Sequence, residues 1–166
     1  MFHNPVLVLL ATAVLACAPA GHRDGVPPGA RVFEGKVVAV ADGDTFTVLD
    51  GATQVRIRLE GIDAPEKGQP FSAKSKQAVS DLVFGQVVRV VQSSKDRYKR
   101  SIAKVYLQDG RCVNEEMLRL GMAWHFKRYS DDAQWAKLEQ QARRSKTGLW
   151  ADPKPIAPWE WRSGAR

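Results

Sequence analysis

The sequence predicts an α+β fold in which a small five-stranded β-barrel carries about three helices. Five short segments show the alternation or the β-branched character of strands, and turn residues separate them. Three other segments place apolar residues at helical spacing. At 166 residues the chain has room for one ordinary domain and little else. Five strands with interleaved helices are most simply closed into one small barrel of the OB-fold type.

The first three predicted strands form a meander. Asp50-Gly51 is a strong signal for a two-residue hairpin turn, and the segment after it alternates strictly between apolar and polar residues. Asp42 to Thr45 forms the turn before the second strand. The three predicted strands are Arg31–Val40, Phe46–Leu49 and Val55–Leu59.

Two more strands and three helices follow. Glycine lies at or just past the end of each predicted helix, at Gly85, Gly121 and Gly148, as expected for a helix C-terminus. A basic loop, 93–100, separates the last two strands, and the prolines after residue 152 predict an extended tail. The predicted strands are Val87–Val91 and Ile102–Leu107, and the predicted helices are Phe71–Phe84, Val113–Leu120 and about Asp131–Ser145.

The N-terminal segment has the features of a targeting sequence. Pro5 to Ala16 is apolar, uncharged and short for a bilayer span, which predicts a signal peptide in residues 1–20. Two processing sites compete: Cys17 follows the apolar run as in a lipoprotein box, whereas Ala18-Pro19-Ala20 resembles an ordinary cleavage site. Either site predicts an exported protein, as an envelope lipoprotein or in secreted or periplasmic form. Residues 21–31, rich in Gly and Pro, are expected to be a linker.

The chain is strongly basic. Its 25 Lys and Arg residues against 18 Asp and Glu residues give a net charge of +7, and the first 30 residues add nothing to that excess. Such a domain attracts polyanions, among them nucleic acids, heparin-like sugars and anionic membranes, although the same charge also favours solubility. Cys112 has no partner at the spacing of a metal site and is expected to be a small buried residue.

Two predicted turns gather carboxylates, which is unexpected in a basic domain. Asp42 and Asp44 share one turn, and Asp63 and Glu66 share another. Hard divalent cations bind several oxygen ligands from carboxylates and carbonyls, so Asp44, Asp63 and the carbonyl after Asp63 could hold such an ion. Taken singly, the aspartates could also be simple turn formers.

The same region holds groups that suit phosphodiester chemistry, which needs an activated water, charge compensation at phosphorus and positioning. Glu66 could accept a proton from a water held near the cation. Arg58 at a strand end and Arg100 at the end of the basic loop have guanidinium forks that match phosphate oxygens. Tyr98 in that loop is an aromatic of the kind that stacks on single strands. Either arginine alone could be a solvated strand end.

Four motifs in this order resemble the staphylococcal nuclease (thermonuclease) family. They are Asp42-Gly43-Asp44-Thr45, residues 56–66 (RIRLEGIDAPE), Asp96-Arg97-Tyr98-Lys99-Arg100 and Val113-Asn114-Glu115. The similarity continues through Gly148-Leu149-Trp150, so the expected thermonuclease-like domain is 32–152, followed by a Pro- and Trp-rich tail at 153–166. That tail, with Pro158-Trp159-Glu160-Trp161-Arg162, is also similar to the tails of bacterial members.

The resemblance implies a calcium-dependent nuclease that cuts DNA and RNA by water attack and leaves 3′-phosphate ends. Tyr98 in the basic loop favours single strands as substrates. The resemblance also implies a role for each matching residue: Asp44, Asp63 and the carbonyl of Ala64 for Ca²⁺; Glu66 as general base; Arg58 and Arg100 at the transition state; Arg97 and Tyr98 for a terminal phosphate. We expect a monomer that contacts a membrane only through a lipid on Cys17.

Two positions depart from the family pattern. Lys99 stands where a glycine is usual, and because lysine adopts a positive φ only at some cost, we expect the loop that carries Arg100 to be reshaped. The aromatic that would stack on the substrate base falls near Lys127, with Phe126 and Tyr129 beside it, and has no assigned position.

Two alternatives to a nuclease are open. One is a catalytically silent nucleic-acid-binding module on the same barrel, and the other is a surface-anchored interaction protein whose basic face meets an anionic polymer. The presence of the whole set of acids and arginines favours the enzyme. Two further residues are expected to be structural: Trp124 in the core, and Asn114 as a cap for backbone donors at a helix start.

Overall fold

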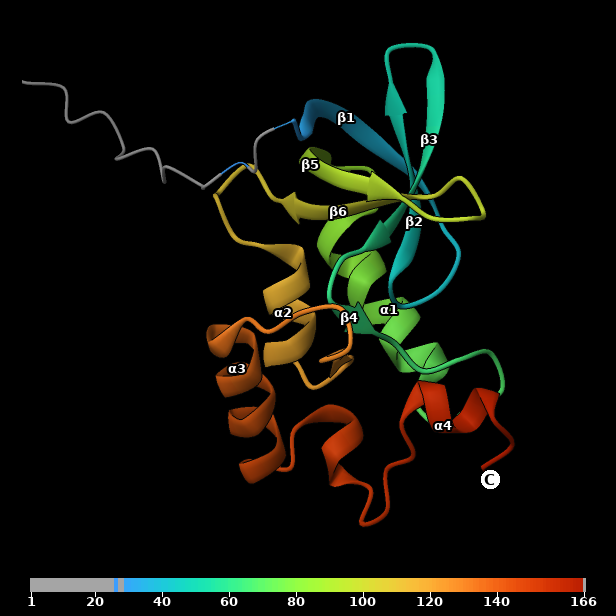
Figure 1. Cartoon of the computed structure of the whole chain (residues 1–166), viewed down its shortest axis with the longest axis vertical. Helices are drawn as coiled ribbons and strands as arrows, with labels where there is room; N and C mark the ends of the chain where they lie inside the picture. The colour runs from blue at the N-terminus through green and yellow to red at the C-terminus, as the bar shows by residue number, and fades with distance from the viewer. Residues whose placement is uncertain (1–25, 27–28, 166) are drawn as a thin grey trace, which may run out of the picture.

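The centre of the molecule is a closed barrel of five strands in the order β1-β2-β3-β6-β5 (Figure 1). The computed structural model describes residue 26 and residues 29–165, so the predicted signal segment with Cys17 and most of the predicted linker lie outside the described residues. The predicted five-stranded barrel is confirmed. Its strands are β1 (Arg31–Val40), β2 (Thr45–Asp50), β3 (Thr53–Leu59), β5 (Val87–Lys95), which extends into the predicted basic loop, and β6 (Ser101–Tyr106).

One parallel strand pair closes the barrel. β3 lies parallel to β6, with Arg58 opposite Ile102, whereas the other pairings around the barrel are antiparallel. On its other side Arg58 is opposite Thr45, the first residue of β2. The turn before β2, the end of β3 and the loop before β6 therefore meet at one end of the barrel.

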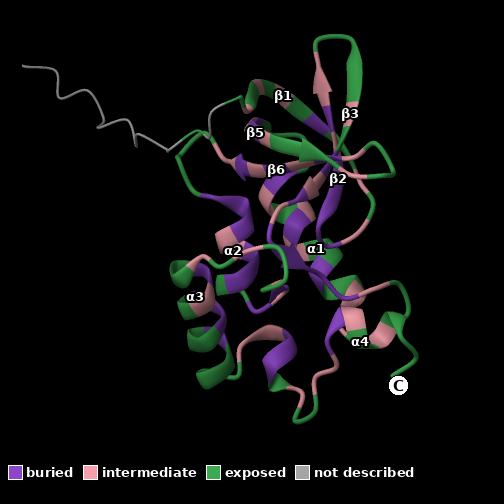
Figure 2. Cartoon of the chain, viewed as in Figure 1, coloured by how far each residue is buried: buried purple, intermediate pink, exposed green. Residues whose placement is uncertain are grey.

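Apolar side chains from the barrel and from two helices form the main core. Inward-facing strand residues such as Phe46, Ile57 and Val90 are fully buried, and they share one packed cluster with Val79 and Met117. Val79 belongs to α1 (Ser72–Val83) and Met117 to α2 (Val113–Arg119). Figure 2 shows the buried residues gathered where the barrel meets these helices. Removal of this apolar surface from water is the main stabilising contribution.

The C-terminal tail forms a helix, so the extended tail predicted from its prolines is wrong. Pro158 is the first residue of α4 (Pro158–Arg162), a position where the missing N–H costs nothing. The Glu160 carboxylate accepts the Ala157 N–H at 3.3 Å and completes the cap. Together with α3 (Ala133–Arg144), the described residues contain four α-helices where about three were predicted. A short 3₁₀ turn, η1 (Gly148–Ala151), lies between α3 and α4.

Aromatic rings hold this tail against the rest of the protein. The Trp159 ring lies 5.5 Å from that of Trp124 and stacks on Phe126 at 5.0 Å with an interplanar angle of 4°. Trp124 is buried in a second cluster with Trp150, which confirms it as a core residue. Such aromatic pairs are each worth about 0.5–1.5 kcal/mol beyond their area burial.

Two strands of two residues each connect this second cluster to the barrel. β4 (Ile62–Asp63) pairs with β7 (Trp124–His125), so Asp63 lies opposite Trp124. Strands this short have no periodicity to detect, and the sequence did not predict them. Cys112 is buried as expected and forms no disulfide within the described residues, and burial raises the pKa of its thiol to about 11. No helix in the described part of the chain is long and apolar enough to cross a bilayer.

Asn114 is structural, but it serves the barrel and not the helix start for which it was predicted. Its Oδ1 accepts the Val105 N–H at 3.1 Å, and its Nδ2 donates to the carbonyls of Glu60 at 2.9 Å and Ala103 at 3.3 Å. These backbone groups belong to β6 and to the turn after β3. The fully buried amide therefore joins α2 to the strand pair that closes the barrel.

Asn114→Ala is expected to destabilise the fold, because it leaves buried backbone groups without a partner. Each such orphaned group costs about 1–3 kcal/mol. The free energy of unfolding from urea denaturation measures the loss, with the exposed Gln108→Ala as control. Equal stability of the two variants would contradict this role of Asn114.

Candidate active site at one end of the barrel

Three strand ends bring the predicted site residues together. Asp44 directly precedes β2, Arg58 is the next-to-last residue of β3, and Arg100 directly precedes β6. The register places Arg58 opposite Thr45, and Ile57 opposite Ser101. The topology of the barrel thus gathers residues that are far apart in sequence.

Arg58 is the central residue of this site, and its side chain is only 13% exposed. Its Nε lies 3.0 Å from Asp44 Oδ1, and its Nη2 donates to Asp63 Oδ1 at 2.8 Å. Its Nη1 donates to the carbonyls of Leu59 at 2.6 Å and Ile62 at 2.7 Å. One guanidinium therefore fixes both aspartates, and the two carbonyls prevent it from rotating.

Asp44 is a buried carboxylate with a network of its own. Its Oδ2 accepts the Ala64 N–H at 2.7 Å, and its Oδ1 accepts the Thr45 hydroxyl at 3.1 Å. Burial raises the pKa of Asp44 to about 7; Arg58 opposes this shift, and the negative charges of Asp42 and Asp63 add to it. The ionised carboxylate is therefore short of positive charge even with Arg58 beside it.

The turn that carries Asp44 packs closely against α1. A Cβ atom on Gly43 would lie 2.0 Å from Ser75 Oγ, so only glycine fits at this position. The Asp42 carboxylate accepts the Asp44 N–H at 3.1 Å and closes the turn. Asp42 therefore supports Asp44 from within the loop.

Glu66 lies on the loop after β4 with a side chain that is 40% exposed. Its backbone N–H donates to Gln69 Oε1 at 2.9 Å, and Gln69 Nε2 donates to the Ile156 carbonyl at 2.7 Å. The buried Gln69 thus ties the Glu66 loop to the C-terminal tail. Glu66 has the access to solvent that a proton acceptor for water needs.

Arg100 also faces this site, in a loop that keeps its turn despite Lys99. Lys99 takes φ 64°, the left-handed conformation that favours glycine, so the expected reshaping of the loop is not observed. Asp96 accepts the Arg100 N–H at 2.9 Å and its Nε at 2.7 Å, and these bonds lower the pKa of Asp96 against the effect of its burial. Arg100 Nη1 lies 3.4 Å from Thr45 Oγ1, next to Asp44.

Arg97 and Tyr98 lie in the same loop and are exposed. Tyr98 is 64% exposed, and Arg97 Nη2 donates to its hydroxyl at 2.7 Å. Both residues are open to solvent at the rim of the site.

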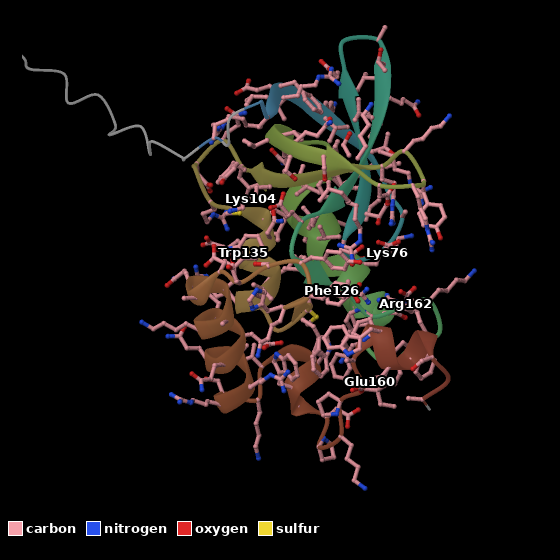
Figure 3. The ribbon with its side chains drawn as sticks, in the orientation of Figure 1. Lys76, Lys104, Phe126, Trp135, Glu160 and Arg162 are labelled. Atoms are coloured by element: carbon pink, nitrogen blue, oxygen red, sulfur yellow. The ribbon has the colours of Figure 1, made fainter. Side chains whose placement is uncertain are left out.

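A residue to which the sequence analysis gave no role completes the cluster: Arg162, in α4. Its Nη2 donates to Asp63 Oδ2 at 2.8 Å, and its Nη1 donates to Asp63 Oδ1 at 3.3 Å and to Glu66 Oε1. Figure 3 shows its side chain on the side of α4 that faces the barrel. Burial lowers the pKa of Arg162, but the bonds to Asp63 and Glu66 outweigh it and raise that pKa. The Pro- and Trp-rich motif that ends in Arg162 was the only signal for it in the sequence.

Phe126, next to Lys127, lines a groove together with Trp124 and Trp159. Phe126 stacks on Trp159 and packs edge-on against Tyr129 at 4.9 Å, and Tyr129 is 66% exposed. Lys127, Arg128 and Arg143 contribute positive charge to the groove. The structure therefore offers aromatic surface at the place where the sequence left the stacking residue unassigned.

The carboxylates of this cluster are the oxygen ligands that a hard cation prefers, and in the structure they pair with two guanidinium groups. Within the described residues, no three Asp, Glu, His or Cys side chains converge on one point. Arg58 instead joins Asp44 to Asp63, and Arg162 joins Asp63 to Glu66. Two neighbouring buried carboxylates, one with a raised pKa, are oxygen ligands whose charge a divalent cation would compensate.

Comparison with known proteins agrees with this geometry. Residues 56–152 match the family described as staphylococcal nuclease homologue. An uncharacterized endonuclease of Escherichia coli O157:H7 is 45% identical over 130 residues, 78% of this chain and 85% of the relative. One from Haemophilus influenzae is 46% identical over 128 residues, 76% of this chain and 71% of the relative.

A third relative carries a more specific name. The micrococcal nuclease of Shigella flexneri is 42% identical over 144 residues, 81% of this chain and 83% of the relative. The matched region contains the end of β3, the segment with Asp63 and Glu66, and the loop with Arg100. The barrel, the gathered acids and arginines, and these similarities together show that the chain belongs to the staphylococcal nuclease family.

Proposed function

We propose that this protein is an exported, calcium-dependent nuclease that hydrolyses phosphodiester bonds of DNA and RNA. Membership of a nuclease family supports nucleic-acid hydrolysis, and relatives bear the names endonuclease and micrococcal nuclease. The observation that carries the proposal is the pair of buried carboxylates on Arg58, beside the half-exposed Glu66. In this proposal the two carboxylates hold the cation, Glu66 accepts the proton and Arg58 supplies fixed positive charge.

Glu66 is the proton acceptor in this proposal. The oxygen of a water attacks phosphorus while its proton passes to the Glu66 carboxylate, and the bond from phosphorus to the 5′ oxygen breaks. The leaving 5′ oxygen takes up a proton and becomes a hydroxyl, so the phosphate stays on the 3′ end. The bond from Arg162 engages Oε1 of Glu66, which leaves Oε2 for the water.

Arg58 and Arg100 provide positive charge where negative charge develops at phosphorus. A guanidinium has five N–H donors, and the four acceptors around Arg58 leave one Nη2 donor for a phosphate oxygen. Arg100 is less constrained: Asp96 holds its Nε, but its Nη1 has a weak contact with the Thr45 hydroxyl at 3.4 Å, and its guanidinium lies over the Tyr98 ring at 5.6 Å from the centroid. Arg58 is therefore a fixed charge, and Arg100 is the arginine with more freedom to clamp a phosphate.

Asp44 and Asp63 would hold Ca²⁺ through their carboxylates, with the Ala64 carbonyl as a further oxygen ligand. Bound there, the ion supplies charge stabilisation at phosphorus and a site for the attacking water. Carboxylates that can hold a cation and guanidinium groups that can bind phosphate oxygens therefore lie next to each other, as a phosphodiester substrate requires.

Substrate binding follows from charge and from exposed aromatic surface. The chain carries a net charge of +7, which favours polyanions. Arg97 and Tyr98 at the rim suit a terminal phosphate, and an exposed aromatic such as Tyr98 suits unpaired bases, so we propose a preference for single strands. We also propose that the protein acts as a monomer.

The proposed activity predicts calcium-dependent digestion of single-stranded DNA and of RNA by the mature domain. Fragments should appear with Ca²⁺, disappear with chelator and carry 3′-phosphate ends that only phosphatase treatment makes extendable. The silent binding module predicts a retarded complex and no fragments. Absence of any calcium-dependent product at high protein concentration would remove the enzyme from consideration.

A catalytic variant shows whether the activity belongs to this site. Glu66→Ser is expected to lower kcat by about a hundred- to a thousandfold, the usual range for a group that acts at the transition state. Glu34→Ser is the matched control, because Glu34 is an exposed acid on β1. Full activity in Glu66→Ser would contradict the role of Glu66 and leave the nuclease assignment standing.

The raised pKa of Asp44 makes a prediction for the metal-free protein. Between its ordinary pKa of 3.8 and about 7, the folded state holds a proton that the unfolded chain has released, so this group lowers stability as the pH rises. The stability of Asp44→Asn minus that of wild type should therefore increase from pH 4 to pH 7 and level off above.

Denaturation in chelator over this pH range measures the difference, with the exposed Asp131→Asn as control. Adding Ca²⁺ at pH 8 should raise the unfolding midpoint of wild type more than that of Asp44→Asn, since ligand binding stabilises the folded state. A stability difference that does not change with pH, or equal calcium effects, would argue against Asp44 as a buried metal ligand.

Export is proposed from the sequence of residues 1–20. We propose that the segment directs the chain out of the cytoplasm and that it is processed either at Cys17 with lipidation or after Ala20. Intact mass spectrometry of the exported protein separates the two sites, because a lipid adds mass to a chain that begins at Cys17. A full-length chain found only in the cytoplasm would contradict both.

A further inference from the structure

Arg162 reaches the two acids from a helix that is held in place by other contacts. Trp159 stacks on Phe126, Pro158 is buried, and Gln69 donates to the Ile156 carbonyl at 2.7 Å. The Glu160 cap fixes the start of the helix. The tail therefore does not depend on the ion pairs of Arg162 for its docking.

The ion pair of Arg162 with Glu66 contributes little to stability, whereas its pair with Asp63 is partly buried, because the Asp63 side chain is 2% exposed. The side chains of Arg162 and Glu66 are 43% and 40% exposed, and pairs this open to solvent are worth about 0–1 kcal/mol. The aromatic stack of Trp159 on Phe126 already attaches the tail to the rest of the protein. The contact is thus better explained by what it does to the acids.

The Arg162 guanidinium sets the spacing and the orientation of the Asp63 and Glu66 carboxylates. Arg58 holds Asp63 Oδ1 at 2.8 Å and Arg162 holds Oδ2 at 2.8 Å, so the plane of this carboxylate is fixed from both sides. Arg162 Nη1 contacts both Asp63 Oδ1 and Glu66 Oε1. The shared contact to Arg162 Nη1 therefore sets the spacing between the proposed metal ligand and the proposed base, while Nη2 holds the other oxygen of Asp63.

We infer that Arg162 is a positioning residue for the reaction, supplied to the active site by the C-terminal helix. The inference rests on the proposed function. Arg162 holds the Glu66 carboxylate in one orientation, which an otherwise exposed side chain with several rotatable bonds would not keep. Because it also occupies Asp63 Oδ2, it competes with a cation for that ligand.

This double contact predicts two effects of opposite sign in Arg162→Gln. Calcium should bind more tightly, by about three- to tenfold, because Asp63 loses a competing positive charge of ordinary ion-pair strength. At saturating calcium kcat should fall by about 10- to 100-fold, the usual cost of losing a group that orients an active-site residue, and KM should change by less than about threefold. Arg162→Lys keeps the positive charge but has no guanidinium fork, so its calcium affinity and its kcat should lie between those of wild type and Arg162→Gln.

The experiment measures calcium affinity by calorimetry without substrate, and kcat and KM on single-stranded DNA at saturating calcium. It compares wild type, Arg162→Gln, Arg162→Lys and Lys154→Gln. Lys154→Gln removes a positive charge from an exposed position of the same tail and should match wild type. A thermal melt of each variant confirms that it is folded at the assay temperature.

Tighter calcium binding together with slower turnover supports the inference. A merely structural contact would weaken calcium binding along with kcat and lower the melting temperature, and that result overturns it. Unchanged kcat, or tighter binding without slower turnover, also overturns it. If wild type neither binds calcium nor hydrolyses DNA, the proposed function fails. If wild type is active and Arg162→Gln behaves like it, the proposed function stands and only this inference fails.

Discussion

The guanidinium of Arg58 holds two buried carboxylates side by side, and the arrangement of the whole site depends on this contact. Asp44 comes from the turn before β2 and Asp63 from β4, and each would be costly to bury without a positive partner. Breaking a buried pair of this kind costs about 3–5 kcal/mol, because a charge is left uncompensated. The antiparallel register of β3 with β2 places Arg58 opposite Thr45 and so beside Asp44, and Asp63 lies only five residues further along the chain.

Even with this contact, the negative charge of the acids at the site exceeds the positive charge of Arg58, and a bound cation would compensate the remainder. Arg58 is shared between two acids, and burial keeps the pKa of Asp44 raised to about 7. Arg162 compensates Asp63 and Glu66 from outside, through a helix that belongs to the C-terminal tail. The proposed active site is therefore built from both ends of the described chain, and the tail contributes charged contacts to it as well as packing.

The sequence predicted the barrel because each signal was local. Strict alternation in Val55–Leu59 and the Asp50-Gly51 turn are properties of a few neighbouring residues, and they gave the strands that the structure contains. The acids and arginines of the site were predicted from motifs, and the strand register explains why they meet. The left-handed conformation of Lys99 was recognised from its position, but the consequence expected for the loop was wrong, because Asp96 holds the turn together.

What the sequence could not predict depends on distant contacts or on very short elements. β4 and β7 have two residues each and show no period. The tail helix was missed because its prolines indicate an extended segment, whereas Pro158 is tolerated at a helix start and Trp159 finds partners in the second cluster. The contact of Arg162 with Asp63 joins residues 99 apart, and no local pattern signals it.

The central claim is that Asp44 and Asp63 form the cation site of a nuclease. Crystals of the mature protein grown with Ca²⁺ and examined by anomalous scattering test it most directly. The account predicts one strong anomalous peak bound by the carboxylates of Asp44 and Asp63. An acid pair that stays bound to Arg58 and Arg162, with no peak at saturating calcium, would contradict it.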